Sequence, residues 1–336
     1  MAQNGPEMIL KFMGAYMHSK ILLVAAKLKV FNHFGNNKLT VKEAADALEM
    51  KESYCSFLLN ALYKMKFLER LKNEDGTIVY FNSTVSKEFL CEDSINYFGD
   101  LLIFQENEWD SWSKLYNTFI SGEPKALDSE DMSSEELQIY MKGMNQIGRF
   151  TGKAVAASIN LQNCHSILDL GCGSGIFSIN FKKRNKNLKC TLIDREEVIE
   201  IARKNFQKEN MDETDFTFLK GNYLMYPFVN KYDCVFISHN IHEYSSEVTL
   251  NLFQNIYQLL NDGGMLIIHD YISTESSIFP DLFSIGMLMQ KQDAHCYSYK
   301  ELLSMLEVTQ FSEVKLVSMG NDIPSSLVIA KKQIVE

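Results

Sequence analysis

The sequence predicts an α/β fold in which a mostly parallel seven-stranded sheet, with an antiparallel hairpin at its edge, follows a helical amino-terminal region. Three observations support this prediction. Short β-rich runs alternate with helical stretches from Ser166 onward, as in parallel sheets covered by helices on both faces. A glycine-rich loop, ILDLGCGSG, contains the first of these runs. Upstream of it apolar residues recur at helical spacing, and a length of 336 residues favours two domains.

The amino-terminal region has the pattern of two helices followed by a hairpin. Apolar residues at helical spacing predict a helix over residues 9–34, and Thr40 with Glu43 is typical of the start of a capped short helix. The run SFLLNALYKMKFLERL after Ser53 predicts the next helix, and the Asp-Gly pair in NEDGTIVYFN predicts a tight turn between two strands. Helix, turn, helix and hairpin together outline a winged helix.

Winged helices often bind DNA, so the charge of this region is informative. Between Thr40 and Gly76 there are six Lys and Arg against seven Asp and Glu, a balance of −1. Such a balance does not suit a phosphate backbone. The second helix also has a broad apolar face, which is better suited to packing than to a nucleic-acid groove. We therefore expect an interaction or dimerisation module.

The connection and the sheet follow in order along the chain. Residues 88–160 predict further helices, with a break at SGEP and a long amphipathic stretch from Ser134 to Ile159. The predicted strands are SILDL, KCTLID, FTFLKG, YDCVFIS, MLIIHDY, VKLVSM and SLVIAKK, of which the last two form the edge hairpin. These patterns predict an amino-terminal domain over residues 1–100, connecting helices over 101–160 and a sheet domain over 161–336.

The overall composition disfavours several classes of protein. A net charge of −10 gives no basic footprint for nucleic acid or an anionic membrane surface. We expect no apolar run of the roughly 18 residues that a membrane helix needs and no signal peptide. Seven cysteines without a CxxC pair indicate reduced thiols rather than a disulfide framework or a zinc site. A cytoplasmic setting is the default expectation.

The glycine loop restricts the ligand that the sheet domain can hold. A phosphate-binding GxxxxGK[ST] loop is excluded because Ile176 and Phe177 follow Gly175. A GxGxxG dinucleotide fingerprint is weakened because Ile176 stands where its last glycine belongs. GxGxG instead lets the amino-acid part and ribose of a nucleoside lie against the backbone at Gly171 and Gly173.

Carboxylates and an aromatic ring follow the strands at the positions such a nucleoside requires. Asp169, two residues before Gly171, can face an ammonium group, and Asp194 at the end of the second strand can accept both ribose hydroxyls. Asn222 and Tyr223 supply an amide for the edge of adenine and a ring for its face. With DLGCGSG and KGNY, these residues resemble class I S-adenosylmethionine-dependent methyltransferases. A tight turn without a ligand is the structural alternative for the loop.

Two histidines lie just after the fourth predicted strand, in SHNIHEYSSE. This is the sheet edge at which open α/β sheets bind ligands. Methyl transfer from a sulfonium requires alignment of donor and acceptor, and a phenolic acceptor must also lose a proton. A phenol with a pKa of about 10 keeps its proton at neutral pH, whereas a histidine with a pKa near 6.5 can remove it.

HEYSSE resembles the HDWxDE element of small-molecule O-methyltransferases with an amino-terminal winged-helix dimerisation domain, the group of plant caffeate and bacterial polyketide O-methyltransferases. The resemblance covers nearly the whole chain. It implies His242 as the general base and Asp270 as the carboxylate that orients it, with S-adenosylhomocysteine as a product. It also implies cofactor contacts at Ser238 and Tyr244, with Tyr244 replacing the family tryptophan. The segment FPDLFSIGMLM resembles the helix that lines the acceptor.

The sequence departs from the family pattern in places. Asn222 stands where the family usually has Asp, the usual Arg-Thr pair near Tyr297 is absent, and Cys296 corresponds roughly to a second acidic partner. On the acceptor side, Met287, Met289 and His295 are the candidate contacts.

Other residues have simpler interpretations. His239 precedes His242 by three residues, but no third metal ligand follows at useful spacing, so we expect no metal. By strand alternation, His269 is expected to be a core histidine with satisfied hydrogen bonds. Cys172 is a small residue in a crowded turn, without a catalytic role.

The sequence therefore predicts an S-adenosylmethionine-dependent methyltransferase acting on the hydroxyl of a small, secondary-metabolite-like acceptor, without metal, nucleic-acid or membrane partners. The resemblance implies that it is a homodimer formed through the amino-terminal domain. C- or N-methylation on the same scaffold is one alternative. A non-catalytic, cofactor-binding regulatory protein is another.

Overall fold

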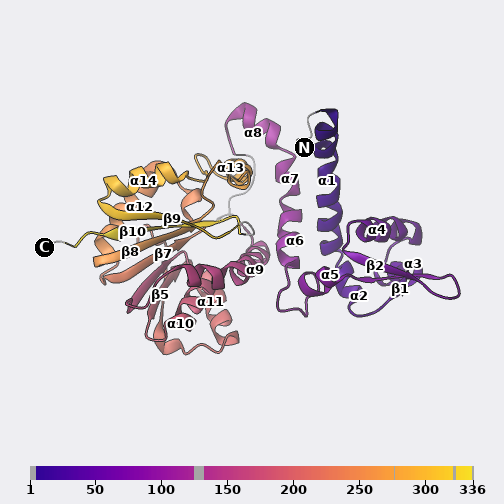
Figure 1. Cartoon of the computed structure of the whole chain (residues 1–336), viewed down its shortest axis with the longest axis horizontal. Helices are drawn as coiled ribbons and strands as arrows, with labels where there is room; N and C mark the ends of the chain where they lie inside the picture. The colour runs from indigo at the N-terminus through magenta and orange to yellow at the C-terminus, as the bar shows by residue number, and fades with distance from the viewer. Residues whose placement is uncertain (1–4, 125–131, 276, 321–322, 335–336) are drawn as a thin grey trace. The chain divides into compact units, whose positions relative to one another are not determined.

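The computed structural model describes residues 5–124, 132–275, 277–320 and 323–334, and the chain divides into two compact units. The first unit comprises Met1–Asp110 with Ser133–Ile147, and the second comprises Ser111–Met132 with Gly148–Glu336. The long helix α9 (Ser134–Ser158) contributes residues to both. Figure 1 labels the elements described below.

The first unit packs helices against a small antiparallel sheet of order β1-β3-β2. Its capping box is present, since the Thr40 Oγ accepts from the Glu43 amide at 3.2 Å and the Thr40 amide donates to Glu43 at 2.8 Å. The predicted order of two helices and a hairpin is confirmed. The elements are α1 (Pro6–Lys27), α2 (Val30–Phe34), β1 (Leu39–Thr40), α3 (Val41–Ala47), α4 (Glu52–Lys64), β2 (Leu68–Lys72), β3 (Ile78–Asn82), α5 (Thr84–Phe89) and α6 (Gly99–Asn107), followed by α7 (Trp109–Trp112).

Two predicted helix boundaries in this region were wrong. The helix expected over residues 9–34 is interrupted because Lys29 adopts a left-handed conformation, with φ of 53°. The helix expected to run through Leu71 ends at Lys64, and Lys66 has φ of 71°. Residues 68–72 instead form β2, whose backbone pairs with β3 from Leu68↔Asn82 to Lys72↔Ile78. Strand pairing thus outweighs the helical spacing of the last apolar residues.

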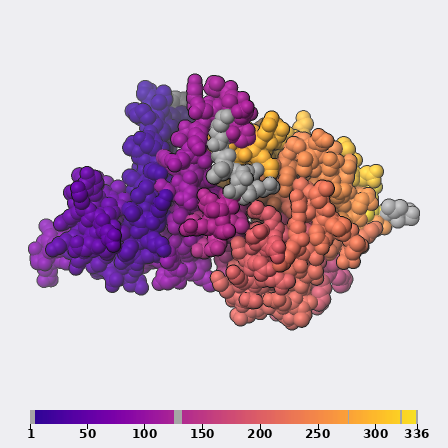
Figure 2. All heavy atoms as spheres, turned by 180° about the vertical axis from the view of Figure 1, so that it is seen from behind, coloured from indigo at the N-terminus to yellow at the C-terminus, as the bar shows by residue number. Residues whose placement is uncertain are grey.

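Helix α1 corrects the expectation that no apolar segment is long enough to cross a membrane. By length and composition it meets that criterion, with a mean hydropathy of 1.3, and 11% of the apolar window is buried. Core helices and signal sequences meet the same criterion. The amino-terminal half of α1 lies at the surface (Figure 2), where its exposed apolar side chains are Met8, Ile9, Leu10, Phe12, Met13, Tyr16 and Met17.

The second unit is built on a seven-stranded sheet of order β6-β5-β4-β7-β8-β10-β9. The first five strands in this order are parallel, and β10 runs antiparallel to both β8 and β9. The predicted fold, including the antiparallel edge hairpin, is confirmed. The strands are β4 (Ser166–Leu170), β5 (Lys189–Asp194), β6 (Phe216–Lys220), β7 (Tyr232–Ser238), β8 (Leu260–Asp270), β9 (Phe311–Ser318) and β10 (Ser326–Lys332).

Helices cover both faces of this sheet. One core cluster joins alternate strand residues such as Leu168 and Val235 to α12 and α14, and a second joins Ile167 and Phe236 to α10 and α11. Figure 1 shows the two helix pairs on opposite faces. The remaining elements are α8 (Leu115–Ser121), α10 (Ile176–Arg184), α11 (Glu196–Lys208), η2 (Glu213–Asp215), η3 (Ile241–Glu243), α12 (Ser246–Leu259), α13 (Phe279–Gln290) and α14 (Tyr299–Val308).

Candidate active site

The glycine loop connects the end of β4 to the start of α10. Gly171, Gly173 and Gly175 all have positive φ, at 65°, 53° and 71°, a conformation that L side chains rarely adopt. A Cβ on Gly171 would lie 2.6 Å from the Asn240 Oδ1, and one on Gly175 would lie 2.4 Å from the ring of Phe206. Backbone conformation and close neighbours therefore both require glycine at these two positions.

A half-buried carboxylate, Asp194, and a buried one, Asp169, flank this loop. Asp194, at the end of β5, accepts from the Gly173 amide at 2.9 Å and from the Arg195 amide at 2.8 Å. Burial raises its pKa, although those backbone hydrogen bonds oppose the change. Asp169, in β4, accepts from the Ser178 hydroxyl at 2.6 Å. Burial raises the pKa of Asp169 to about 7, with the Ser178 bond opposing and the Asp194 charge adding to the shift.

A polar network lies over the first glycine. The Tyr223 and Tyr244 hydroxyls are 2.7 Å apart, and the Tyr223 hydroxyl lies 3.4 Å from the Asn240 Oδ1. The two tyrosine rings are nearly perpendicular, with centroids 6.4 Å apart. The Asn222 Oδ1 is used locally, accepting from the Leu224 amide at 2.9 Å. Sequence reasoning missed Asn240, although its place just after the fourth strand was a usable signal.

Ser238 and His269 form a buried chain across two strands. The Ser238 hydroxyl lies 2.8 Å from the His269 Nδ1, and the Ser325 hydroxyl lies 2.8 Å from its Nε2. Both ring nitrogens thus have partners, and burial holds the pKa of His269 well below its usual range. The interpretation of His269 as a core histidine with satisfied hydrogen bonds is confirmed.

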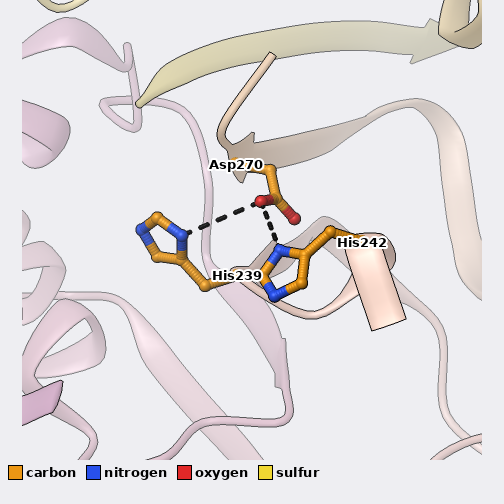
Figure 3. Close-up of side chains that lie close together, drawn as sticks. All are labelled: His239, His242 and Asp270. Atoms are coloured by element: carbon orange, nitrogen blue, oxygen red, sulfur yellow. Dashed lines mark hydrogen bonds and ion pairs between the residues drawn. The ribbon is translucent and has the colours of Figure 1, made fainter. Parts of the chain in front are cut away.

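His242 and Asp270 form a buried pair between η3 and the end of β8 (Figure 3). The His242 Nδ1 lies 2.7 Å from the Asp270 Oδ1, and the Tyr271 amide donates to the same oxygen at 2.8 Å. Burial lowers the pKa of His242, but the charge and hydrogen bond of Asp270, with the Glu243 charge, outweigh it and raise the pKa above its ordinary value. Burial acts to raise the Asp270 pKa, yet the charge and hydrogen bond of His242 lower it overall.

His239 approaches the same carboxylate from the end of β7. Its Nδ1 is 3.8 Å from the Asp270 Oδ1 (Figure 3). Burial lowers its pKa to about 4, against the Asp270 charge. His239, His242 and Asp270 each offer a ligand atom, all within 4.8 Å of one another. The fold thus brings a third side chain that could bind a metal, from a distant strand, which residue spacing did not reveal.

Aromatic side chains from β8 and α13 surround the histidines. Phe283 packs edge-on against His242 with ring centroids 4.9 Å apart, and Tyr271 lies 4.6 Å from Phe283. Sequence reasoning missed both. Met287 and Met289 are buried in α13. A cavity of about 550 Å³ lies nearby, lined by Ser245, Ser246, Glu247, Leu288, Asp293, Ala294 and His295.

Together these features define a class of protein. A parallel sheet with a glycine loop after its first strand, an acidic residue ending its second strand and a His-Asp pair beyond its fourth and fifth strands is the arrangement of a class I methyltransferase.

The chain belongs to the family described as O-methyltransferase domain, which matches residues 97–305, and residues 10–92 match the O-methyltransferase dimerisation domain. It is an S-adenosylmethionine-dependent methyltransferase. It is 22% identical to the tetracenomycin polyketide synthesis 8-O-methyl transferase TcmO of Streptomyces glaucescens, over 98% of this chain and 97% of that protein. It is 23% identical to acetylserotonin O-methyltransferase of Bos taurus, over 86% and 88% of the two chains.

The fold is similar to that of human N-acetylserotonin methyltransferase solved in complex with S-adenosylmethionine. The TM-score is 0.88 at 19% identity, with 99% of this chain and 100% of that chain covered.

Proposed function

We propose that the enzyme methylates a hydroxyl of a small aromatic acceptor, with His242 as the general base and Asp270 as the residue that orients it. The observation that carries the proposal is the buried contact of 2.7 Å between the His242 Nδ1 and the Asp270 Oδ1. Because Asp270 occupies Nδ1, the other ring nitrogen is left to accept a proton. Tyr271 and Phe283 supply flat apolar surface beside it, which suits an aromatic ring.

The residues around the glycine loop fit S-adenosylmethionine. Gly171 presents backbone without a Cβ directly against Asn240, Asp194 is a half-buried acceptor for ribose hydroxyls, and Asp169 is a buried carboxylate that a cofactor ammonium would neutralise. Asn222, Tyr223, Ser238 and Tyr244 complete the proposed cofactor contacts, to which we add Asn240. Met287, Met289 and His295 are proposed for the acceptor side. When bound, the cofactor supplies an electrophilic methyl group on a sulfonium.

The protein contributes alignment and proton removal. When the methyl carbon is transferred from sulfur to the acceptor oxygen and S-adenosylhomocysteine leaves, the acceptor proton would pass to the His242 Nε2, and Asp270 would stabilise the resulting imidazolium. A raised pKa makes His242 a stronger base than ordinary histidine. C- or N-methylation would use the same cofactor contacts, and a non-catalytic regulator would not need a His-Asp pair.

Calorimetry and turnover together test this proposal. S-adenosylhomocysteine is titrated into the wild type, His242→Ala and, as a matched control, His165→Ala, whose exposed side chain lies at the opposite end of β4. All three proteins are expected to bind it, and His242→Ala alone to lose methyl transfer to a panel of phenols. Absence of binding by the wild type would refute the cofactor site. Full turnover by His242→Ala would refute the base.

We also propose a homodimer formed through the amino-terminal region of residues 1–100, supported by the dimerisation-domain match and by the exposed apolar side chains of α1. Seven buried, free cysteines support a reducing, cytoplasmic setting, and the balanced charge of residues 40–76 argues against a nucleic-acid partner. Sedimentation velocity would test the dimer, and a monomer at micromolar concentration would refute it.

A further inference from the structure

The proposed base lies beside three buried polar atoms that have no hydrogen-bond partner among the described residues. They are both ring nitrogens of His239 and the Oδ2 of Asp270. Buried polar atoms are almost always paired, so an unpaired set next to a catalytic pair calls for a functional explanation. The first oxygen of Asp270 accepts from both His242 and the Tyr271 amide. The second oxygen is open.

His239 is held so that one ring nitrogen faces this carboxylate. Its φ of 52° lies in the left-handed region, and its amide donates to the His269 carbonyl at 2.8 Å. Its ring packs between those of His269 and Tyr271, with centroids 4.6 Å from each. Figure 3 shows His239 and His242 on either side of Asp270. The 3.8 Å from the His239 Nδ1 to the Asp270 Oδ1 exceeds a hydrogen bond by only about 1 Å.

We propose that His239 is a positioning residue for the reaction: a movement of about 1 Å lets its Nδ1–H donate to the Asp270 Oδ1, the oxygen that it faces, and so holds that oxygen on His242. This inference rests on the function proposed above. Two donors on one oxygen leave the carboxylate free to rotate about its Cβ–Cγ bond, whereas a third donor from the His239 side restrains it. A neutral His239 makes this contact without adding a charge. That movement would pair one of the three open atoms, the His239 Nδ1.

The positive φ of His239 limits the substitutions that can be used to test its role. Glycine and asparagine both tolerate a positive φ, so His239→Gly removes the imidazole without backbone strain and His239→Asn keeps a short donor. In His239→Gly we expect kcat with a phenolic acceptor to fall roughly 10- to 100-fold, the loss of a hydrogen bond to a charged group. The acceptor KM and the affinity for S-adenosylhomocysteine should stay within about twofold, because the contacts proposed for the cofactor and the acceptor do not include His239. His239→Asn should keep most of the activity.

Chemical rescue separates positioning from a structural role. Removal of the ring leaves a hole beside Asp270, so free imidazole should restore kcat in His239→Gly and leave the wild type unchanged. An NMR titration of His242 gives a readout independent of turnover. With one donor fewer on Asp270, the pKa of His242 should rise in His239→Gly and return when imidazole is added.

The titratable groups around the two histidines are Glu243 on η3, His269, Asp270 and Tyr271 at the end of β8, and Cys296 after α13.

Several results would overturn the inference. An unchanged kcat and unchanged His242 titration in His239→Gly would do so, as would a loss that imidazole cannot restore. A rise in acceptor KM at constant kcat would make His239 an acceptor contact instead. Wild-type activity lost on chelation and restored by Zn²⁺ would assign the three side chains to a metal. If the wild type methylates no phenol, the proposed function fails, while the His242 titration still decides the role of His239.

Discussion

Replacement of Asp270 by Asn tests the proposed base most directly. The substitution keeps the size of the side chain but removes the charge 2.7 Å from the His242 Nδ1. An asparagine amide can donate to Nδ1, which leaves the proton on Nε2, where the acceptor proton must go. Catalysis by a histidine base is worth roughly 10²- to 10⁴-fold, so we expect kcat to fall within that range and no further.

The pH profile adds a signed prediction. Asp270 raises the pKa of His242 against the effect of burial. In the wild type the acid limb of kcat/KM should therefore lie above the ordinary histidine value of about 6.5, and in Asp270→Asn it should move below it. Since a phenol ionises by itself near pH 10, the deficit of the variant should shrink as pH approaches that value.

The assay is methyl transfer to a phenolic acceptor from pH 5 to 10, with Asp281→Asn as the matched control. Asp281 lies on α13, where it accepts from the Ser273 hydroxyl at 3.4 Å. The control should retain wild-type activity and its acid limb. Wild-type kcat in Asp270→Asn, or an acid limb that does not move, would refute the assigned roles of both residues.

Three further predictions concern the cofactor site and stability. Because the pKa of Asp169 is raised to about 7, calorimetric affinity for S-adenosylmethionine should fall as pH drops from 8 to 6, and Asp169→Asn should flatten this dependence. Gly171→Ala, with a positive φ and a Cβ 2.6 Å from Asn240, should lower unfolding free energy by about 1–3 kcal/mol in denaturant titrations, whereas Gly14→Ala in α1 should not destabilise the protein. His239 binds its proton near pH 4 when folded and near 6.5 when unfolded, so stability should decline by up to about 3 kcal/mol as pH falls through that window. His239→Asn should remove that part of the decline, and an unchanged acid sensitivity would contradict the assignment.

The sequence predicted the sheet better than it predicted element boundaries. Alternating β-rich and helical runs predicted the sheet domain, because each parallel strand is buried on both faces and its composition is distinctive. Residues 68–72 were assigned to a helix because their apolar spacing continues that of α4, and only pairing with β3 reveals the strand. Strand β8 begins at Leu260 rather than near Met265. The composition of residues 261–264 is turn-like, so they were not predicted as part of the strand.

In the candidate site, too, residues in a local motif were predicted, whereas contacts between distant segments were not. His242 and Asp270 were predicted from a known motif and its spacing of 28 residues, and the structure brings them within hydrogen-bond distance. The position of His239 opposite Asp270 depends on how strand ends converge, which no local pattern encodes, whereas the place of Asn240 just after the fourth strand was a signal for its position over Gly171. The helical spacing of α1 was predicted, but its length and hydropathy as a possible membrane span were missed because polar residues interrupt its apolar ones.

The hydrogen bond between His269 and Ser325 has a consequence for the order in which the parts of the site can assemble during synthesis. His239 is anchored to the His269 carbonyl, and the His269 ring is anchored to a residue 56 positions downstream, just before β10. A nascent chain that has left the ribosome only as far as β8 already contains the glycine loop and both members of the His-Asp pair. It lacks β10, the antiparallel neighbour of β8. The hydrogen bond that anchors the His269 ring can therefore form only after the segment leading into the last strand has been synthesised, later than every residue of the glycine loop and of the His-Asp pair.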